Sequence, residues 1–261
     1  MIHLLFHQRI FLRKVLLLSY VCSTSLFALV NIAPVDIGAR PGFSGNLSGS
    51  LSSKSGNTQK DDYSLGLRAQ YDQGSDYLVW GTLTYDYGTA RGVKNEDKTY
   101  AHVRTIHALY DNDWCGELFV QTEQDNFRDI KARSLAGAGV RWRFLNADDW
   151  GKGYAGMGGL IEKIDYTNPQ INPNENNSRL NSYIAYTKSF MTASKVSYVG
   201  YFQPKFDAPS DYVTSHTVEL NIPIYQKLSL SLSANYAYDS LPPIGVQKKD
   251  TAYLTSLLWE F

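Results

Sequence analysis

The 261-residue sequence is moderately polar, with 43% hydrophobic residues, a mean hydropathy of −0.30 and a formal net charge of +0. This polarity excludes a membrane protein built from apolar helices. No run of basic residues indicates a nucleic-acid partner. Tyrosine and glycine are abundant, with 19 and 20 residues, a composition that favours strands and tight turns.

The first 28 residues have the pattern of a cleaved signal peptide. Arg9, Arg13 and Lys14 form a basic region, and the apolar stretch 15–28 follows it. This stretch is too short and too isolated for a spanning helix, and a buried N-terminal helix is the alternative. We therefore expect export across the inner membrane, with removal of residues 1–28.

The mature chain is predicted to consist of a short N-terminal lead, residues 29–41, and a single folded region, residues 42–261. Loss of the three basic residues and of no acidic ones changes the net charge to −3. Cys115 is then the one remaining cysteine, so no internal disulfide can form.

From residue 43 to the C-terminus, apolar and polar residues alternate with a period of two. In the segment 228–238, for example, Leu228, Leu230 and Leu232 lie on one face, opposite three serines. Such alternation predicts strands with one apolar and one polar face. Twelve strands are expected, near 42–54, 59–73, 76–90, 98–111, 114–126, 132–145, 151–167, 178–190, 194–206, 211–223, 228–240 and 250–261.

A soluble sandwich would show the same alternation. Three features favour an antiparallel transmembrane β-barrel: the export signal, the length of the strands, and the tyrosines at their ends, such as Tyr63 and Tyr71. The connections also alternate in length, as in outer-membrane barrels. Short turns are expected at 73–75, 111–113, 191–193 and 224–227, and longer external loops at 91–97, 168–177 and 241–249, of which 168–177 is the largest.

Several motifs resemble one family. They are Ser55-Gly56-Asn57-Thr58, the segment Ala136–Arg141, the segment Tyr238–Gly245 with Lys249-Asp250-Thr251, and the terminal Leu257–Phe261. The mature chain resembles a domain-of-unknown-function family of salt-induced outer-membrane proteins. The resemblance implies a barrel in the outer membrane of a Gram-negative bacterium, in contact with its lipids. Trp259 and Phe261 are similar to the C-terminal signal read by the barrel-insertion machinery, and the family carries no agreed activity.

Two motifs raise the question of chemistry. Residues 151–156 match the pattern GxGxxG, but they lie inside an expected strand with no helix behind them, so that close packing is the simpler interpretation. An outer-membrane lipid hydrolase would need a histidine base at the lipid face, where His107 and His216 are expected. No serine partner follows from the spacing. The sequence therefore predicts no enzyme, cofactor or metal.

The inward face is the main candidate site. Its expected charged residues are Arg68, Arg104, Glu117, Glu123, Arg133, Arg141, Arg143, Lys205 and Glu219. These charges either line a water-filled path and bias ion passage, or pair across the lumen and fill it. Twelve strands form a cylinder about 24 Å across, with about 12 Å left between side chains, which permits either an open path or a filled lumen.

The leading hypothesis is a narrow channel for ions or small polar solutes, linked to osmotic stress. A non-conducting barrel with a structural or surface-binding role is the alternative, and a lipid hydrolase is the third.

Overall fold

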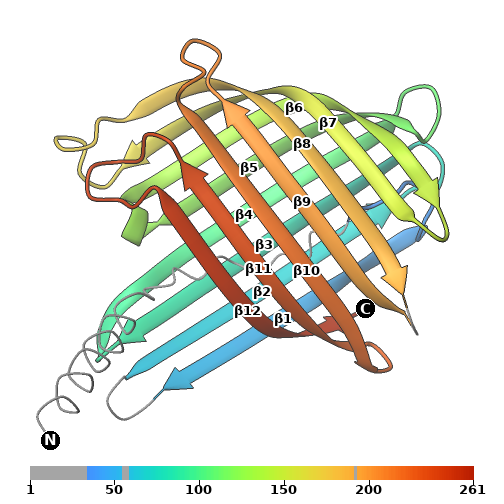
Figure 1. Cartoon of the computed structure of the whole chain (residues 1–261), viewed down its shortest axis with the longest axis horizontal. Coiled ribbons are helices and arrows are strands. Elements are labelled where there is room, and N and C mark those ends of the chain that lie inside the picture. Colours follow the sequence, from blue (N-terminus) through green and yellow to red (C-terminus); the bar gives the residue numbers. More distant parts are fainter. Residues whose placement is uncertain (1–33, 55–58, 191–192) are drawn as a thin grey trace, which may run out of the picture.

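The computed structural model describes residues 34–54, 59–190 and 193–261, in which the chain forms one closed barrel of twelve antiparallel strands (Figure 1). Each strand pairs with its neighbours along the chain, and the first strand pairs with the last. The predicted fold class is therefore confirmed. The expected signal peptide, 1–28, lies outside the described residues.

The strand bounds agree closely with the alternation in the sequence. The elements are β1 (Gly42–Lys54), β2 (Lys60–Asp72), β3 (Tyr77–Ala90), β4 (Val93–Ala108), β5 (Trp114–Asp125), the 3₁₀ turn η1 (Asn126–Arg128), β6 (Ile130–Ala147), β7 (Gly151–Tyr166), β8 (Glu175–Phe190), β9 (Ser194–Pro204), β10 (Tyr212–Tyr225), β11 (Leu228–Asp239) and β12 (Lys249–Glu260).

The expected loop 91–97 is wrong. Arg91 and Gly92 form a two-residue turn with positive φ angles of 52° and 75°, and Ala90 pairs directly with Val93. This is the backbone conformation of a type I′ hairpin, which matches the twist of the strands it joins. The polar residues after this turn extend β4 instead, because a lumen-facing strand position can be polar.

The two ends of the barrel differ. We call the end that holds the start of β1 and Phe261 the terminal end, and the opposite one the far end. Connections at the far end include 167–174 and 240–248, whereas the terminal end has shorter ones such as 148–150 and 226–227. The connection 240–248 is longer than 167–174, because β8 begins earlier than expected, so the prediction that 168–177 is the largest loop is wrong.

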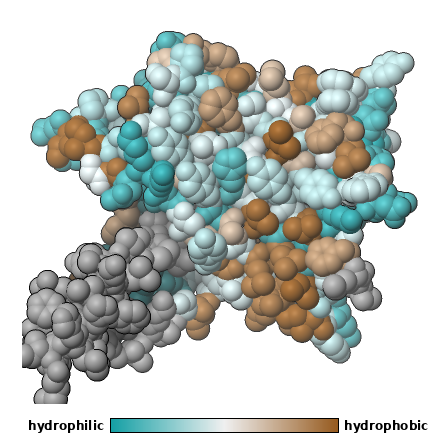
Figure 2. Space-filling view, viewed as in Figure 1, coloured by the Kyte–Doolittle hydropathy of each residue, from teal (hydrophilic) through white to brown (hydrophobic). Residues whose placement is uncertain are grey.

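The outer surface is apolar and carries two rows of aromatic side chains. Tyr63 and Tyr71 lie on β2, about 26 Å apart along the strand, and belong to opposite rows. At the terminal end Trp114 and Trp142 stack with ring centroids 5.6 Å apart. Figure 2 shows brown side chains gathered on the lower part of one face, where β10, β11 and β12 lie. An apolar band between aromatic rows is the surface of a membrane barrel.

The last residue of the chain extends the seam between β1 and β12 that closes the barrel. The backbone N–H of Gly45 donates to the carbonyl oxygen of Phe261 at 3.1 Å, and the N–H of Phe261 donates back at 3.0 Å. Its ring lies 6.1 Å from that of Phe43 and 5.8 Å from that of Trp259. Both residues of the expected insertion signal thus lie at the seam between β1 and β12.

Candidate functional site

The interior of the barrel is strongly charged. Six of the nine expected inward residues line one internal cavity: Arg68, Arg104, Glu117, Glu123, Arg133 and Arg141. Arg143 lies nearer the terminal end, Lys205 lies at the far end, and Glu219 is buried on β10. Their alternation with apolar outward neighbours places them there, since successive side chains of a strand point to opposite faces.

An ion-pair network occupies the lumen toward the far end. Glu162 on β7 accepts hydrogen bonds from Arg133 Nη2 and from Arg179 Nε, both at 2.7 Å. Arg179 also reaches Asp211 at 3.2 Å, and Lys205 Nζ lies 2.6 Å from the same carboxylate. Charges buried in this way need close partners, and here they have them.

Two members of this network, Arg179 and Asp211, were absent from the residues expected from the sequence. Arg179 lies near the start of β8, where polar residues precede the apolar alternation and obscure the strand. Asp211 precedes β10 and resembles an ordinary loop residue. The pairing of β8 with β7 brings Arg179 to Glu162, and Asp211 joins the network through Arg179.

The N-terminal lead is a second feature that sequence reasoning missed. Residues 34–37 enter the lumen at the terminal end, and we call them the plug segment. Ile37 packs against Leu78, Ile106 and Cys115 in a small buried cluster. The carbonyl oxygen of Val35 accepts a hydrogen bond from Arg141 Nη1 at 2.9 Å. The sequence gives no sign of this role, because Asp36 between Val35 and Ile37 is too short a stretch to show the alternation of a strand or the periodicity of a helix.

Asp36 is the polar anchor of the plug segment. Its carboxylate accepts hydrogen bonds from Lys152 Nζ at 2.6 Å and from Tyr154 Oη at 2.7 Å, and Arg143 Nη1 lies 3.5 Å away. Burial by itself raises the pKa of Asp36, but these hydrogen bonds and the nearby positive charges outweigh it and lower the pKa below 3.8. The carboxylate is therefore ionised and held at neutral pH.

The backbone after the plug segment is tied to the barrel wall. The carboxylate of Asp72, which is almost fully buried, accepts hydrogen bonds from the backbone N–H groups of Gly38 at 3.0 Å and Arg40 at 3.1 Å. These contacts hold the chain at the rim of the terminal end, from which it continues into β1.

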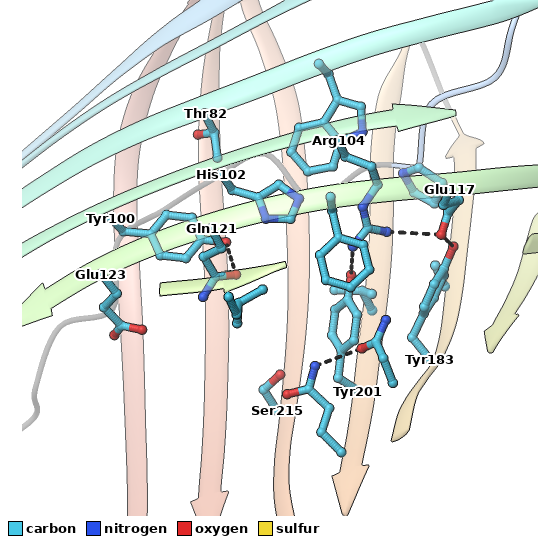
Figure 3. A pocket seen from close by; sticks show the side chains of 18 of the residues that line it. Thr82, Tyr100, His102, Arg104, Glu117, Gln121, Glu123, Tyr183, Tyr201 and Ser215 are labelled. Carbon is cyan, nitrogen blue, oxygen red and sulfur yellow. Dashed lines mark hydrogen bonds and ion pairs between the residues drawn. The ribbon is translucent and has the colours of Figure 1, made fainter. Parts of the chain in front are cut away.

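A cavity of about 330 Å³ lies between the plug segment and the far end (Figure 3). Pro34 and Val35 form part of its floor, and its wall extends to Arg128 in η1. A second cavity of about 380 Å³ lies toward the terminal end. Both are lined by Pro34, Val35 and Arg68, so these three residues form the boundary between them.

Comparison with protein families matches residues 48–261 to the family described as "Protein of unknown function, DUF481". The chain belongs to this family. The match begins within β1 and continues to Phe261, so that it covers nearly all of the barrel and excludes the plug segment. The family membership expected from the C-terminal motifs is confirmed.

Three solved structures with a similar chain path have low sequence identity to this chain. The translocator domain of the autotransporter NalP from Neisseria meningitidis has 9% identity and a TM-score of 0.44, and the match covers 84% of this chain and 87% of that one. The β-domain of the Bordetella autotransporter BrkA has 11% identity and a TM-score of 0.39, with 84% and 98% covered. The transport unit of the Escherichia coli autotransporter AIDA-I has 9% identity and a TM-score of 0.36, with 89% and 92% covered. A comparison with curated protein sequences finds no match.

This member of the family carries both lipid-face histidines on its outer surface. The hydroxyl of Tyr198 lies 2.8 Å from Nδ1 of His216, and Thr214 Oγ1 lies 3.2 Å from its Nε2. Thr214 donates its own proton to the carbonyl oxygen of Tyr201 at 2.6 Å. That proton points away from the imidazole, which is the opposite of what a nucleophile and its base require. His107 contacts the carbonyl oxygen of Ala108.

The glycine motif 151–156 lies in β7. A Cβ atom at Gly156 would overlap the ring of Tyr183, so the glycine leaves room for that ring to lie flat against the wall. Tyr183 can then donate to Glu117 Oε2 at 2.8 Å.

In the described ranges, no group of three or more His, Cys, Asp or Glu side chains could hold a metal ion. No described helix is long and apolar enough to cross a membrane.

Proposed function

We propose that this protein is an outer-membrane barrel of a Gram-negative bacterium and forms a narrow channel that its own N-terminal segment holds closed. The observation that carries the proposal is the insertion of residues 34–37 into the lumen. The apolar outer band and its aromatic rows support a position in the lipid bilayer. The expected entry route, through the barrel-insertion machinery, is part of the proposal.

The closed state is supported by two layers of contacts. At the terminal end, the hydrogen bonds of Asp36 and the packing of Ile37 hold the plug segment in place. A segment that only connects the signal peptide to β1 would not need such contacts. Nearer the far end, Glu162 binds two arginines from opposite sides. The cavities on either side of Val35 leave room for small solutes once the plug segment moves. The expected link with osmotic stress stays a prediction.

Conductance in planar bilayers tests this function. The mature wild-type protein is expected to be mostly silent, whereas the variant Asp36→Ala/Ile37→Asp should show frequent, discrete current steps. The variant loses the anchor to Lys152 and places a charge among apolar side chains, and both changes expel the plug segment. Asp149→Ala, an exposed substitution at the same end, is the matched control and should stay silent.

Steady conductance of the wild-type protein that the double variant does not change would show that residues 34–37 are no plug. Silence of both proteins, after correct folding, would favour the non-conducting alternative, in which the barrel has a structural or surface-binding role.

A further inference from the structure

The cavity above the plug segment has an unusual lining. Among its described residues six are cationic and two are acidic, and six aromatic side chains complete the wall: Trp80, Tyr100, Phe119, Tyr154, Tyr183 and Tyr201. Its volume of about 330 Å³ lies at the lower end of the range for small-molecule sites, about 300–1,000 Å³. A space that only holds water needs neither the cations nor the rings.

Arg104 is held by long hydrogen bonds. Its Nη1 lies 3.4 Å from Glu117 Oε2 and its Nη2 lies 3.5 Å from the Tyr201 hydroxyl, both at the outer limit of hydrogen bonding (Figure 3). Its Nε is buried and has no hydrogen-bond partner in the described part of the chain. By contrast, Arg133 and Arg179 bind their carboxylate at 2.7 Å.

Apart from the Glu117 carboxylate, aromatic faces surround this guanidinium. Its central carbon lies 4.9 Å from the ring centroid of Phe119, 5.6 Å from that of Tyr183 and 5.8 Å from that of Trp80. Stacking on rings stabilises a guanidinium and leaves its edge, where the N–H donors lie, available for a planar anion.

The local charges do not balance. Glu117 is shared between Arg104 and Arg141, whose Nε lies 3.9 Å from Oε1, and it also accepts a hydrogen bond from Tyr183. One carboxylate is therefore the counter-ion of two buried arginines, and both ion pairs are long. The excess is one positive charge, and a single negative charge placed beside Arg104 would neutralise it.

His102 provides a second polar group in the same part of the cavity. It lies two residues before Arg104 on β4, on the same face, and is only 5% exposed. Neither ring nitrogen makes a hydrogen bond of good geometry among the described residues, although the Gln121 side chain lies within reach of the ring. Its ring stacks near Trp80 and Phe119, with centroids 4.8 Å and 6.1 Å away. A buried polar group without a well-formed hydrogen bond is costly, and a ligand would provide one.

We propose that this cavity is a binding site for a small organic monocarboxylate with an apolar or aromatic body. The carboxylate binds the edge of Arg104 and accepts a hydrogen bond from His102. The body lies between the aromatic side chains. One excess charge selects a monoanion, and the rings select an apolar body over an inorganic anion. The site does not depend on conduction, because the cavity lies on the far-end side of the plug segment.

Titration calorimetry on the detergent-folded wild-type protein tests the site, with benzoate as the probe. We expect benzoate to bind, and its neutral isostere benzamide and inorganic phosphate to bind at least about tenfold more weakly. This comparison needs no variant, so that it is independent of any folding defect. Equal binding of benzoate and benzamide, or no benzoate binding by a correctly folded barrel, would overturn the proposal.

Two variants locate the site. Arg104→Gln should weaken benzoate binding at least about tenfold, because it removes the charge that pairs with the carboxylate. Phe119→Leu should weaken benzoate and leave acetate unchanged, because it removes only part of the aromatic wall. Arg91→Gln, at an exposed turn of the far end, is the control and should bind as the wild type does. Unchanged benzoate affinity in Arg104→Gln would contradict the assignment.

Discussion

Glu162 shows how a single residue stabilises the interior of the barrel. Its side chain is fully buried and accepts close hydrogen bonds from Arg133 on β6 and Arg179 on β8. Asn177 donates a further hydrogen bond at 3.1 Å. Burial of this carboxylate is costly, and the two guanidiniums offset the cost only while both remain in contact.

Replacement of this carboxylate should therefore be strongly destabilising. Glu162→Gln leaves two buried arginines without their shared counter-ion, and we expect a loss of about 3–5 kcal/mol in the free energy of unfolding. Urea-induced unfolding of the refolded protein measures it. The control is Lys163→Gln on the outer side of the same strand, which breaks an exposed pair with Asp165 and should cost about 1 kcal/mol or less. Equal shifts for the two variants would show that the network contributes little.

The plug segment is the element whose position depends most directly on a charge. Asp36 must be ionised to hold Lys152, and Ile37 covers Cys115, which is 1% exposed. The native pKa of Asp36 is lowered, so the stability that it contributes is complete above the ordinary value of 3.8 and is lost as the pH falls through the lower native pKa. Acid should therefore release the segment, and neutral or alkaline pH should not.

The reactivity of Cys115 measures this release. With a disulfide reagent that reacts in acid, such as dithiodipyridine, Cys115 should be protected at neutral pH and become reactive below about pH 3.8. In Asp36→Asn it should react already at neutral pH, with little further change on acidification. Protection of the wild-type thiol down to pH 2, in a barrel that stays folded, would contradict the role of Asp36.

At the scale of the whole molecule, closure joins residues that are 216 positions apart, since Gly45 pairs with Phe261. The terminal residue thus completes the seam, and the resemblance assigns it a role in insertion as well. These two roles can be separated, because one belongs to the folded barrel and the other to its assembly in the cell.

Deletion of Phe261 should reduce the amount of protein in the outer membrane of cells several-fold, while refolding into detergent still proceeds. Phe43→Leu removes the ring partner of Phe261 without changing the C-terminus, and it should leave insertion in cells unchanged. Fractionation of membranes with detection of the folded form measures both. Normal insertion of the deletion variant would show that Phe261 acts at the seam alone.

Much of this barrel follows from local pattern. The twelve strands, the inward position of residues such as Arg104 and Glu117, and the outward position of His216 depend on alternation with a period of two, which a strand imposes on its own side chains. The polar start of β4 and that of β8 were harder to predict, because they have no apolar alternation and resemble loops.

The sequence by itself thus determined the barrel, its strand number and the two faces of each strand, because each of these depends on neighbours within about ten residues. Only the tertiary structure decided which inward charges meet and whether the lumen is filled. Arg179 meets both Glu162 and Asp211, and Asp36 meets Lys152 and Tyr154, across distances along the chain that no local pattern spans. The closed ring sets these contacts, since the register between strands fixes which side chains share a level of the lumen.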